Sequence, residues 1–120
     1  MVRNIVALLT RFIPRTILQR VAHVGLKSIS WFYSGTAFED PIDGRTYRKM
    51  LPYGRVRTRP NALAPHSLSL ERHRALWLFL NEFSDFFTSS ARMLHMAPEY
   101  CFIKRFRSLS SLDYVTGDLD

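Results

Sequence analysis

The strongest constraint on the fold comes from the last third of the chain, where two short apolar runs flank one amphipathic segment. Residues 93–97 form an apolar run suited to a buried strand, and Pro98 ends it. Residues 100–107 predict a helix with apolar side chains on one side, and residues 112–116 predict a second strand that stops before Gly117. Strand, helix and strand in this order predict a compact βαβ unit with a right-handed crossover.

The ends of the two predicted strands carry acidic residues at the spacing of a nucleotide site. In a nucleotide-binding βαβ unit, the loop after the first strand approaches the ligand, and an acidic residue about 20 positions on accepts hydrogen bonds from ribose hydroxyls. Glu99 and Asp118 have this spacing. One carboxylate suits a ribose diol because it can accept both hydroxyl hydrogens. Residues 95–99 contain no glycine, so an ordinary surface turn stays an alternative.

Two further helical patterns precede this unit. Apolar residues recur at helical spacing over residues 2–33, and Pro14 is expected to divide this segment into two short helices. Such a basic amphipathic stretch can lie on a membrane surface or pack on the rest of the fold, and we favour packing. The second pattern starts at Ser69, a candidate N-cap, with Glu71 in the first turn. Its aromatic side chains are expected to be mostly core: Trp77, Phe83, Phe86 and Phe87.

Glycine and proline punctuate residues 34–68, which predicts turns and short strands. Charge is concentrated here as well, because residues 1–60 hold 11 basic and 3 acidic side chains, against 6 and 7 in residues 61–120. Tyr47 and Tyr53 lie among the cations, as in surfaces that stack bases, although buried tyrosines and a solvated basic surface are the plainer interpretation. The candidate nucleic-acid contacts are Arg45, Arg48, Lys49, Arg55, Arg57 and Arg59.

Composition narrows the class of protein further. A hydrophobic content of 47% excludes wholesale disorder, and a single cysteine, Cys101, excludes a disulfide framework and a cysteine-rich zinc module. No apolar run approaches the roughly 18 residues that a transmembrane segment needs. The apolar run at residues 5–9 is short for a signal peptide. We therefore expect a cytoplasmic location.

Five blocks of sequence resemble a bacterial family of S-adenosylmethionine-dependent methyltransferases. In chain order they are LPYG (51–54), RPNAL (59–63), SLERHRALWL (69–78), LHMAPE (94–99) and DYVTGDL (113–119). The resemblance covers about residues 35–120 and implies a class I methyltransferase with a Rossmann-like sheet. It places the cofactor, S-adenosylmethionine, on His95, Ala97, Pro98, Glu99 and Asp118, with Asp118 binding the ribose.

Catalytic roles are not assigned by this resemblance. His95 lies alone in an apolar strand, where a packed or hydrogen-bonded histidine is more common than a catalyst. The Arg72-His73-Arg74 cluster resembles a signature of the family, and on a helix it can simply anchor the preceding loop. No residue is named as the base that deprotonates the methyl acceptor, and the acceptor itself is unknown.

The resemblance also implies a small zinc-binding knuckle before the signature helix. Members of the family look as though they carry two Cys-x-x-Cys pairs there. The matching positions here are Asp40, Asp43, Ala64 and Ser67. Tetrahedral zinc prefers thiolate or imidazole ligands, and Ala64 has no ligand atom. Asp40, Asp43 and His66 would make only a weak mixed site, so we predict no structural zinc and no metal ligands.

Together these patterns predict an α/β chain. Basic amphipathic helices occupy residues 1–33, a degenerate zinc-knuckle-like turn region occupies 34–68, and the signature helix and the first, incomplete βαβ unit of a Rossmann-like sheet occupy 69–120. The predicted function is that of the N-terminal part, or a truncated relative, of a methyltransferase, and we expect these 120 residues to be inactive alone. The alternatives are a non-catalytic module that binds RNA or another polyanion, and a structural partner of another protein.

Overall fold

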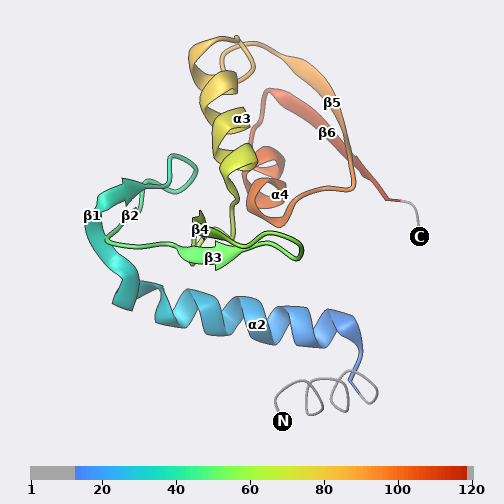
Figure 1. The fold of residues 1–120 in the computed structure, drawn as a ribbon. Helices are drawn as coiled ribbons and strands as arrows, with labels where there is room; N and C mark the ends of the chain where they lie inside the picture. Colours follow the sequence, from blue (N-terminus) through green and yellow to red (C-terminus); the bar gives the residue numbers. More distant parts are fainter. Residues whose placement is uncertain (1–12, 119–120) are drawn as a thin grey trace.

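The computed structural model describes residues 13–118, which contain helices and three separate two-stranded sheets (Figure 1). The elements are α2 (Arg15–Ile29), the 3-10 helix η1 (Ser30–Tyr33), β1 (Ser34–Glu39), β2 (Thr46–Tyr47), β3 (Leu51–Tyr53), β4 (Arg59–Leu63), α3 (Glu71–Glu82), β5 (Ala91–Met96), α4 (Tyr100–Arg107) and β6 (Leu112–Gly117). This mixture of helices and small sheets agrees with the α/β class at the coarse level. The described residues do not contain a complete Rossmann-like sheet.

Helix α2 begins directly after Pro14, as the predicted break requires. The fixed φ of proline suits a helix start, and the Pro14 carbonyl accepts the N–H groups of Ile17 and Leu18. The other expected helix, before Pro14, falls outside the described residues. Figure 1 shows α2 along one side of the molecule, with the β3–β4 pair between it and α3. None of the helices within residues 13–118 is long and apolar enough to cross a membrane.

The prediction that the apolar stripe of residues 2–33 packs on the rest of the fold is wrong for the part of the stripe that lies on α2. One side of α2 contacts α4, where Lys27 Nζ donates to Tyr100 Oη at 2.9 Å and the His23 ring lies 4.5 Å from the Tyr100 ring. Val21 and Val24 lie on the other side, and each is 65% exposed. The helix therefore packs through the side that carries His23, Lys27 and the half-buried Leu18 and Leu26, and not through the stripe of Ile17, Val21 and Val24.

The turn-rich segment forms the predicted short strands. β1 pairs with β2 and β3 with β4, both antiparallel. Tyr47 is buried with Met50 and Ala64 in a small cluster beneath these pairs, whereas Tyr53 is exposed. The two tyrosines therefore differ: Tyr47 is a core residue, and Tyr53 is on the surface.

Helix α3 begins one residue later than the sequence indicated. Its N-cap is Leu70, so the prediction of Ser69 as N-cap is wrong. The Ser69 hydroxyl instead donates to the Asp40 carboxylate at 3.2 Å, a partner 29 residues away. At the helix start, Nδ1 of His73 accepts the Leu70 N–H at 3.0 Å, and Glu71 occupies the first turn as expected.

The predicted βαβ unit is confirmed as a parallel pair with a crossover helix. β5 and β6 pair without a register shift from Ala91 opposite Leu112 to Met96 opposite Gly117, and α4 connects them. The prediction of a buried strand over residues 93–97 is wrong for one face, since burial alternates along β5. The outer face of the β5–β6 pair, which points away from α4, is not covered by any described element. Its apolar side chains are therefore exposed: Leu94, Met96 and Val115.

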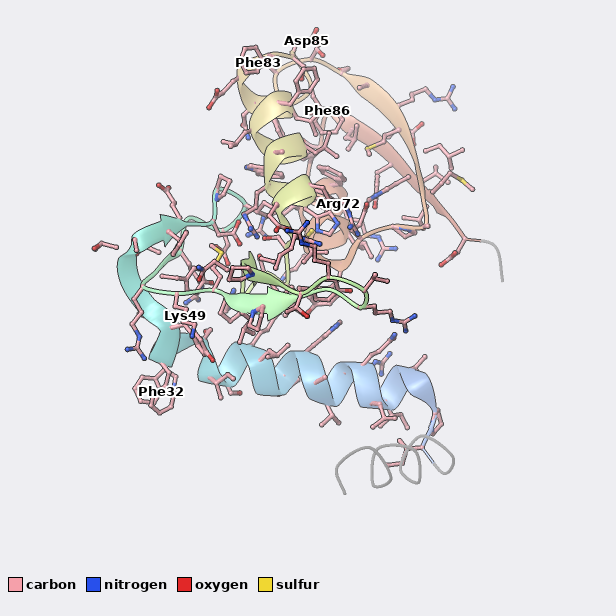
Figure 2. All side chains as sticks on the ribbon, in the orientation of Figure 1. Phe32, Lys49, Arg72, Phe83, Asp85 and Phe86 are labelled. Atoms are coloured by element: carbon pink, nitrogen blue, oxygen red, sulfur yellow. The ribbon has the colours of Figure 1, made fainter. Side chains whose placement is uncertain are left out.

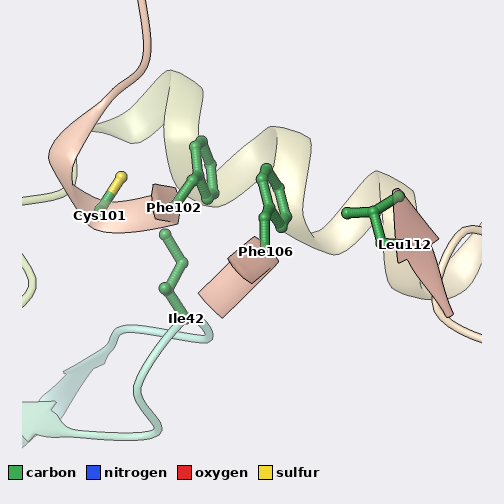
Figure 3. Close-up of a cluster of buried hydrophobic side chains, with 5 residues drawn as sticks. All are labelled: Ile42, Cys101, Phe102, Phe106 and Leu112. Carbon is green, nitrogen blue, oxygen red and sulfur yellow. The ribbon is translucent and has the colours of Figure 1, made fainter. Parts of the chain in front are cut away.

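The main core lies between α3, α4 and the inner face of the β5–β6 pair. Phe102 and Phe106 of α4 are fully buried and stack at 5.2 Å, and Trp77 of α3 stacks on both. Ile42, from the turn between β1 and β2, reaches the same cluster (Figure 3). Phe86 and Phe87 pack at the edge of this core, but Phe83 is 74% exposed, so its expected place in the core is wrong.

Candidate functional site

The carboxyl ends of β5 and β6 meet at one edge of the parallel pair. The Ala97 N–H donates to the Gly117 carbonyl at 2.8 Å, directly after the last paired residues of the two strands. Ala97 has a positive φ of 46°, which turns the chain sharply toward α4. The structure therefore brings residues 97–99 and Asp118 together at this edge, as the spacing predicted.

Behind this edge lies a buried network of polar side chains that comes from four elements. Nε2 of His95 is hydrogen-bonded to Oε2 of Glu99, and Nδ1 of His95 lies 2.8 Å from the hydroxyl of Tyr114. Nε2 of His73, on α3, is buried and lies 3.9 Å from the other oxygen of Glu99. The hydrogen bond of Glu99 to His95 thus ties the loop before α4 to strand β5, and Nε2 of His73 faces Glu99 without a hydrogen bond.

Electrostatics favour a negative Glu99 and a neutral His73. Burial acts to raise the pKa of Glu99, but the hydrogen bond from His95 and the Glu99 backbone N–H outweigh it and hold this pKa below its ordinary value. Burial, together with the charge of Arg72, lowers the pKa of His73. The network therefore carries its negative charge on the loop that leads into α4.

The candidate cofactor residues divide into two groups. Both ring nitrogens of His95 are engaged inside the protein, which matches the packed, hydrogen-bonded alternative. Glu99 also turns toward this network. Ala97 and Asp118 are exposed at the strand edge, and Pro98 is half-buried beside them. The sequence assigned Tyr114 no role and His73 at most a part in anchoring the loop before α3, since the tertiary fold alone brings them to His95 and Glu99.

The Arg72-His73-Arg74 cluster anchors the preceding loop. The Arg74 guanidinium donates to the carbonyl of Ser69 at 2.7 Å and to that of Ala62 at 2.9 Å. Arg72 is exposed (Figure 2). The interpretation of this cluster as a structural anchor is confirmed for Arg74.

Residues 40–45 and 64–69 form two turns with the same backbone hydrogen bonds. In each turn, the N–H of the first residue donates to the carbonyl of the sixth, at 2.9 and 3.0 Å. The N–H of the fifth residue donates to the carbonyl of the first, at 2.8 and 2.9 Å. The fifth residues, Gly44 and Leu68, both have positive φ, of 72° and 61°. The candidate knuckle is therefore a pair of matching turns.

Side-chain hydrogen bonds join the two turns. The Ser67 and Ser69 hydroxyls both donate to Oδ2 of Asp40, which is fully buried. Nδ1 of His66 lies 3.1 Å from Oδ2 of Asp43. Each acid of the first turn is thus linked to a polar side chain of the second.

These residues do not fit a zinc ion. The four knuckle positions are the first and fourth residues of the turns, and Ala64 brings no ligand atom to them. The Asp40 carboxylate already accepts both serine hydroxyls and the Ile42 N–H. Within residues 13–118 no three His, Cys, Asp or Glu side chains are placed to hold a metal ion.

Cys101 is buried, and burial and the charge of Glu99 raise its pKa to about 12, which disfavours the thiolate form.

The six candidate nucleic-acid contacts do not form one free basic surface. Arg59 makes two hydrogen bonds to Glu71, Arg48 donates to the Phe32 carbonyl, and Arg45 lies 3.8 Å from Asp43. Lys49, Arg55 and Arg57 are exposed. Half of the set therefore has partners within the protein.

Comparison with protein-family models, with curated proteins and with solved structures gives no significant match to the chain. Function is accordingly argued from the site and its chemistry.

Proposed function

We propose that residues 91–118 form the cofactor-binding βαβ unit of an S-adenosylmethionine-dependent methyltransferase. The observation that carries the proposal is the meeting of residues 97–99 and Asp118 at the carboxyl edge of a parallel strand pair. In open α/β sheets, ligands bind outside the carboxyl ends of the strands. The methyl acceptor is left unnamed, because no described residue has the position and partners of a catalytic base.

The outer face of the β5–β6 pair supports the same proposal. Leu94, Met96 and Val115 are exposed there. Parallel sheets are normally covered on both faces, because their crossovers place helices on each side. The exposed face thus suits a strand pair that belongs to a larger sheet, as in a Rossmann-like domain.

Each part of this edge has a role in the proposal. The Asp118 carboxylate accepts the hydrogen bonds of the two ribose hydroxyls. The backbone of residues 97–99 lies beside the rest of the cofactor, and Glu99 fixes this loop through its hydrogen bond to His95. When bound, S-adenosylmethionine supplies an electrophilic methyl group on a sulfonium, and the protein positions it in line with the acceptor.

Isothermal titration calorimetry with S-adenosylhomocysteine tests the proposal. We expect the parent chain to bind this ligand and Asp118→Asn to bind it about 10- to 100-fold more weakly, because hydrogen bonds to a charged carboxylate are lost. Asp113→Asn is the matched control, since Asp113 lies near the other end of β6 from Asp118 and pairs with Arg92 at 3.1 Å. No binding by the parent chain, or equal binding by the parent and Asp118→Asn, would reject the proposed site.

A further inference from the structure

We propose that the outer face of α2, together with Trp31 and Phe32, binds the surface of an anionic membrane. This surface lies away from the proposed methyltransferase edge and does not depend on it. The outer face is defined here by Ile17, Val21 and Val24 of α2.

The three residues of the outer face form one row along the helix. They follow each other at spacings of four and three, so their side chains lie on the same side of α2. Val21 and Val24 are 65% exposed and Ile17 is 49% exposed. His23 and Lys27, which contact Tyr100 of α4, lie on another side, where Leu18 and Leu26 are half-buried. An apolar row therefore runs along the solvent side of a helix whose other side is fixed to α4.

Trp31 and Phe32 continue this apolar surface beyond the end of α2. Their rings stack at 3.8 Å, and they are 65% and 55% exposed. Figure 2 shows Phe32 at the edge of the molecule, pointing away from α3 and α4. Aromatic side chains of this kind are enriched where a protein meets the interface between lipid and water.

The charged residues in this part of the sequence are all basic. The chain has no Asp or Glu before Glu39, and Arg20 lies exposed on α2. Beside Phe32 an open groove of about 640 Å³ is lined by Ile29, Phe32, Tyr33, Arg48 and Lys49. Its two cations and its apolar side chains suit a lipid phosphate and the adjoining acyl chain. An apolar helix face with cations at its border is the pattern of a helix that lies in the plane of an anionic bilayer.

The charge and the apolar row together favour lipid over the other occupants. RNA would bind the cations, but it would not account for the exposed apolar row of Ile17, Val21 and Val24. A second copy of the chain would cover the row, but it would bring a surface with the same positive charge against the first. An anionic bilayer satisfies both parts of the surface.

Vesicle binding, followed by the fluorescence of Trp31 in a Trp77→Phe background, tests the proposal. We expect binding and a blue shift with vesicles of equal parts phosphatidylcholine and phosphatidylglycerol, and much weaker binding to phosphatidylcholine alone. Val24→Glu should lower the affinity at least about tenfold, because a charge replaces an apolar side chain at the lipid surface. Lys49→Gln should lower it about fivefold, the effect of one cation near an anionic surface.

Gln19→Glu is the matched control for Val24→Glu. It makes the same change of charge on an exposed position of α2 outside the apolar row, and circular dichroism checks that both variants keep their helix content. Equal affinity for neutral and anionic vesicles, or equal loss in Gln19→Glu and Val24→Glu, would overturn the proposal. So would a dimer without vesicles that Val24→Glu converts to monomer, which would assign the surface to a second copy. Tight RNA binding with no vesicle binding would also overturn it.

Discussion

Single carboxylates connect distant parts of this chain, and Asp40 shows it best. Its buried carboxylate accepts the hydroxyls of Ser67 and Ser69 and the N–H of Ile42. Three donors thus converge on one charge, which agrees with the rule that a buried carboxylate is stable only when it is well hydrogen-bonded. Two hydrogen bonds between the matching turns therefore depend on Asp40, and the contact of Asp43 with His66 is a further link.

Replacing Asp40 with alanine should destabilise the chain substantially. The change leaves two buried serine hydroxyls and one backbone N–H without their acceptor, and we expect the free energy of unfolding to fall by about 3 kcal/mol. Urea denaturation followed by circular dichroism measures this change. Glu39→Ala is the control, because it removes the neighbouring acid from an exposed position and should leave stability nearly unchanged. Equal effects of the two substitutions would contradict the assigned role of Asp40.

A second prediction at this scale concerns pH. The pKa of His73 is lowered in the folded protein, mainly by burial, so the unfolded chain takes up a proton that the folded chain resists. The free energy of unfolding should therefore fall as the pH drops below about 6.5, the ordinary pKa of histidine. The lowered pKa of Glu99 adds a loss of the same sign below about 4.5.

His73→Gln isolates the contribution of this histidine. The amide oxygen of glutamine can accept the Leu70 N–H in place of Nδ1, but it does not titrate. We expect urea midpoints measured at about pH 7.5 and pH 5.5 to differ less in His73→Gln than in the parent chain. The same difference in both proteins would show that His73 does not contribute to the pH dependence.

At the level of elements, helix α4 carries the main core. It buries Phe102 and Phe106 against Trp77 and the inner side of the β5–β6 pair. Arg105 of α4 also donates a hydrogen bond to the backbone carbonyl of Ile42, in the first knuckle turn, at 2.7 Å. The helix thus joins the knuckle turns to the parallel strands.

Two identical substitutions test this arrangement. Phe106→Ala should lower the free energy of unfolding by about 3–5 kcal/mol, because a fully buried aromatic side chain leaves a cavity. Phe83→Ala removes the same side chain from a position that is 74% exposed, so it should cost less than about 1 kcal/mol. Thermal or urea denaturation compares the two. A large loss in Phe83→Ala would mean that Phe83 is covered in solution.

The elements also show how far the sequence could predict this structure. The range of α4 was predicted at Tyr100–Arg107, because Pro98 limits it before and its apolar residues recur at helical spacing. Ser69 was misassigned as an N-cap, since its real partner, Asp40, lies 29 residues away. Residues 93–97 were predicted as a buried strand, but a short apolar run does not reveal whether anything covers the second face of β5.

The candidate site divides in the same way. The positions of Asp118 and residues 97–99 follow from the spacing of the strands and helix in a βαβ unit, and this spacing can be recognised in the local sequence. The network of His73, His95, Glu99 and Tyr114 requires α3 to pack on the unit, and nothing local in the sequence specifies that contact. Tertiary hydrogen bonds are therefore the part that the sequence alone did not predict.

At the scale of the whole molecule, three small sheets take the place of one large one. The radius of gyration is 16.5 Å, above the roughly 14 Å of a compact domain of this length, because α2 lies beside the rest of the fold and not within it (Figure 1). The outer face of α2 and the outer face of the β5–β6 pair both stay uncovered. The proposals above would cover the first face with lipid and the second with further elements of a methyltransferase domain.

The matching turns have a consequence for the conditions in which the chain can keep its fold. A knuckle held by thiolates and zinc fails when a chelator removes the metal or an oxidant attacks the sulfur. Here two carboxylates, two hydroxyls and an imidazole link the two turns, and none of these groups is a thiol. The one cysteine is buried in the core. The stability of this segment is therefore uncoupled from zinc supply and from redox potential.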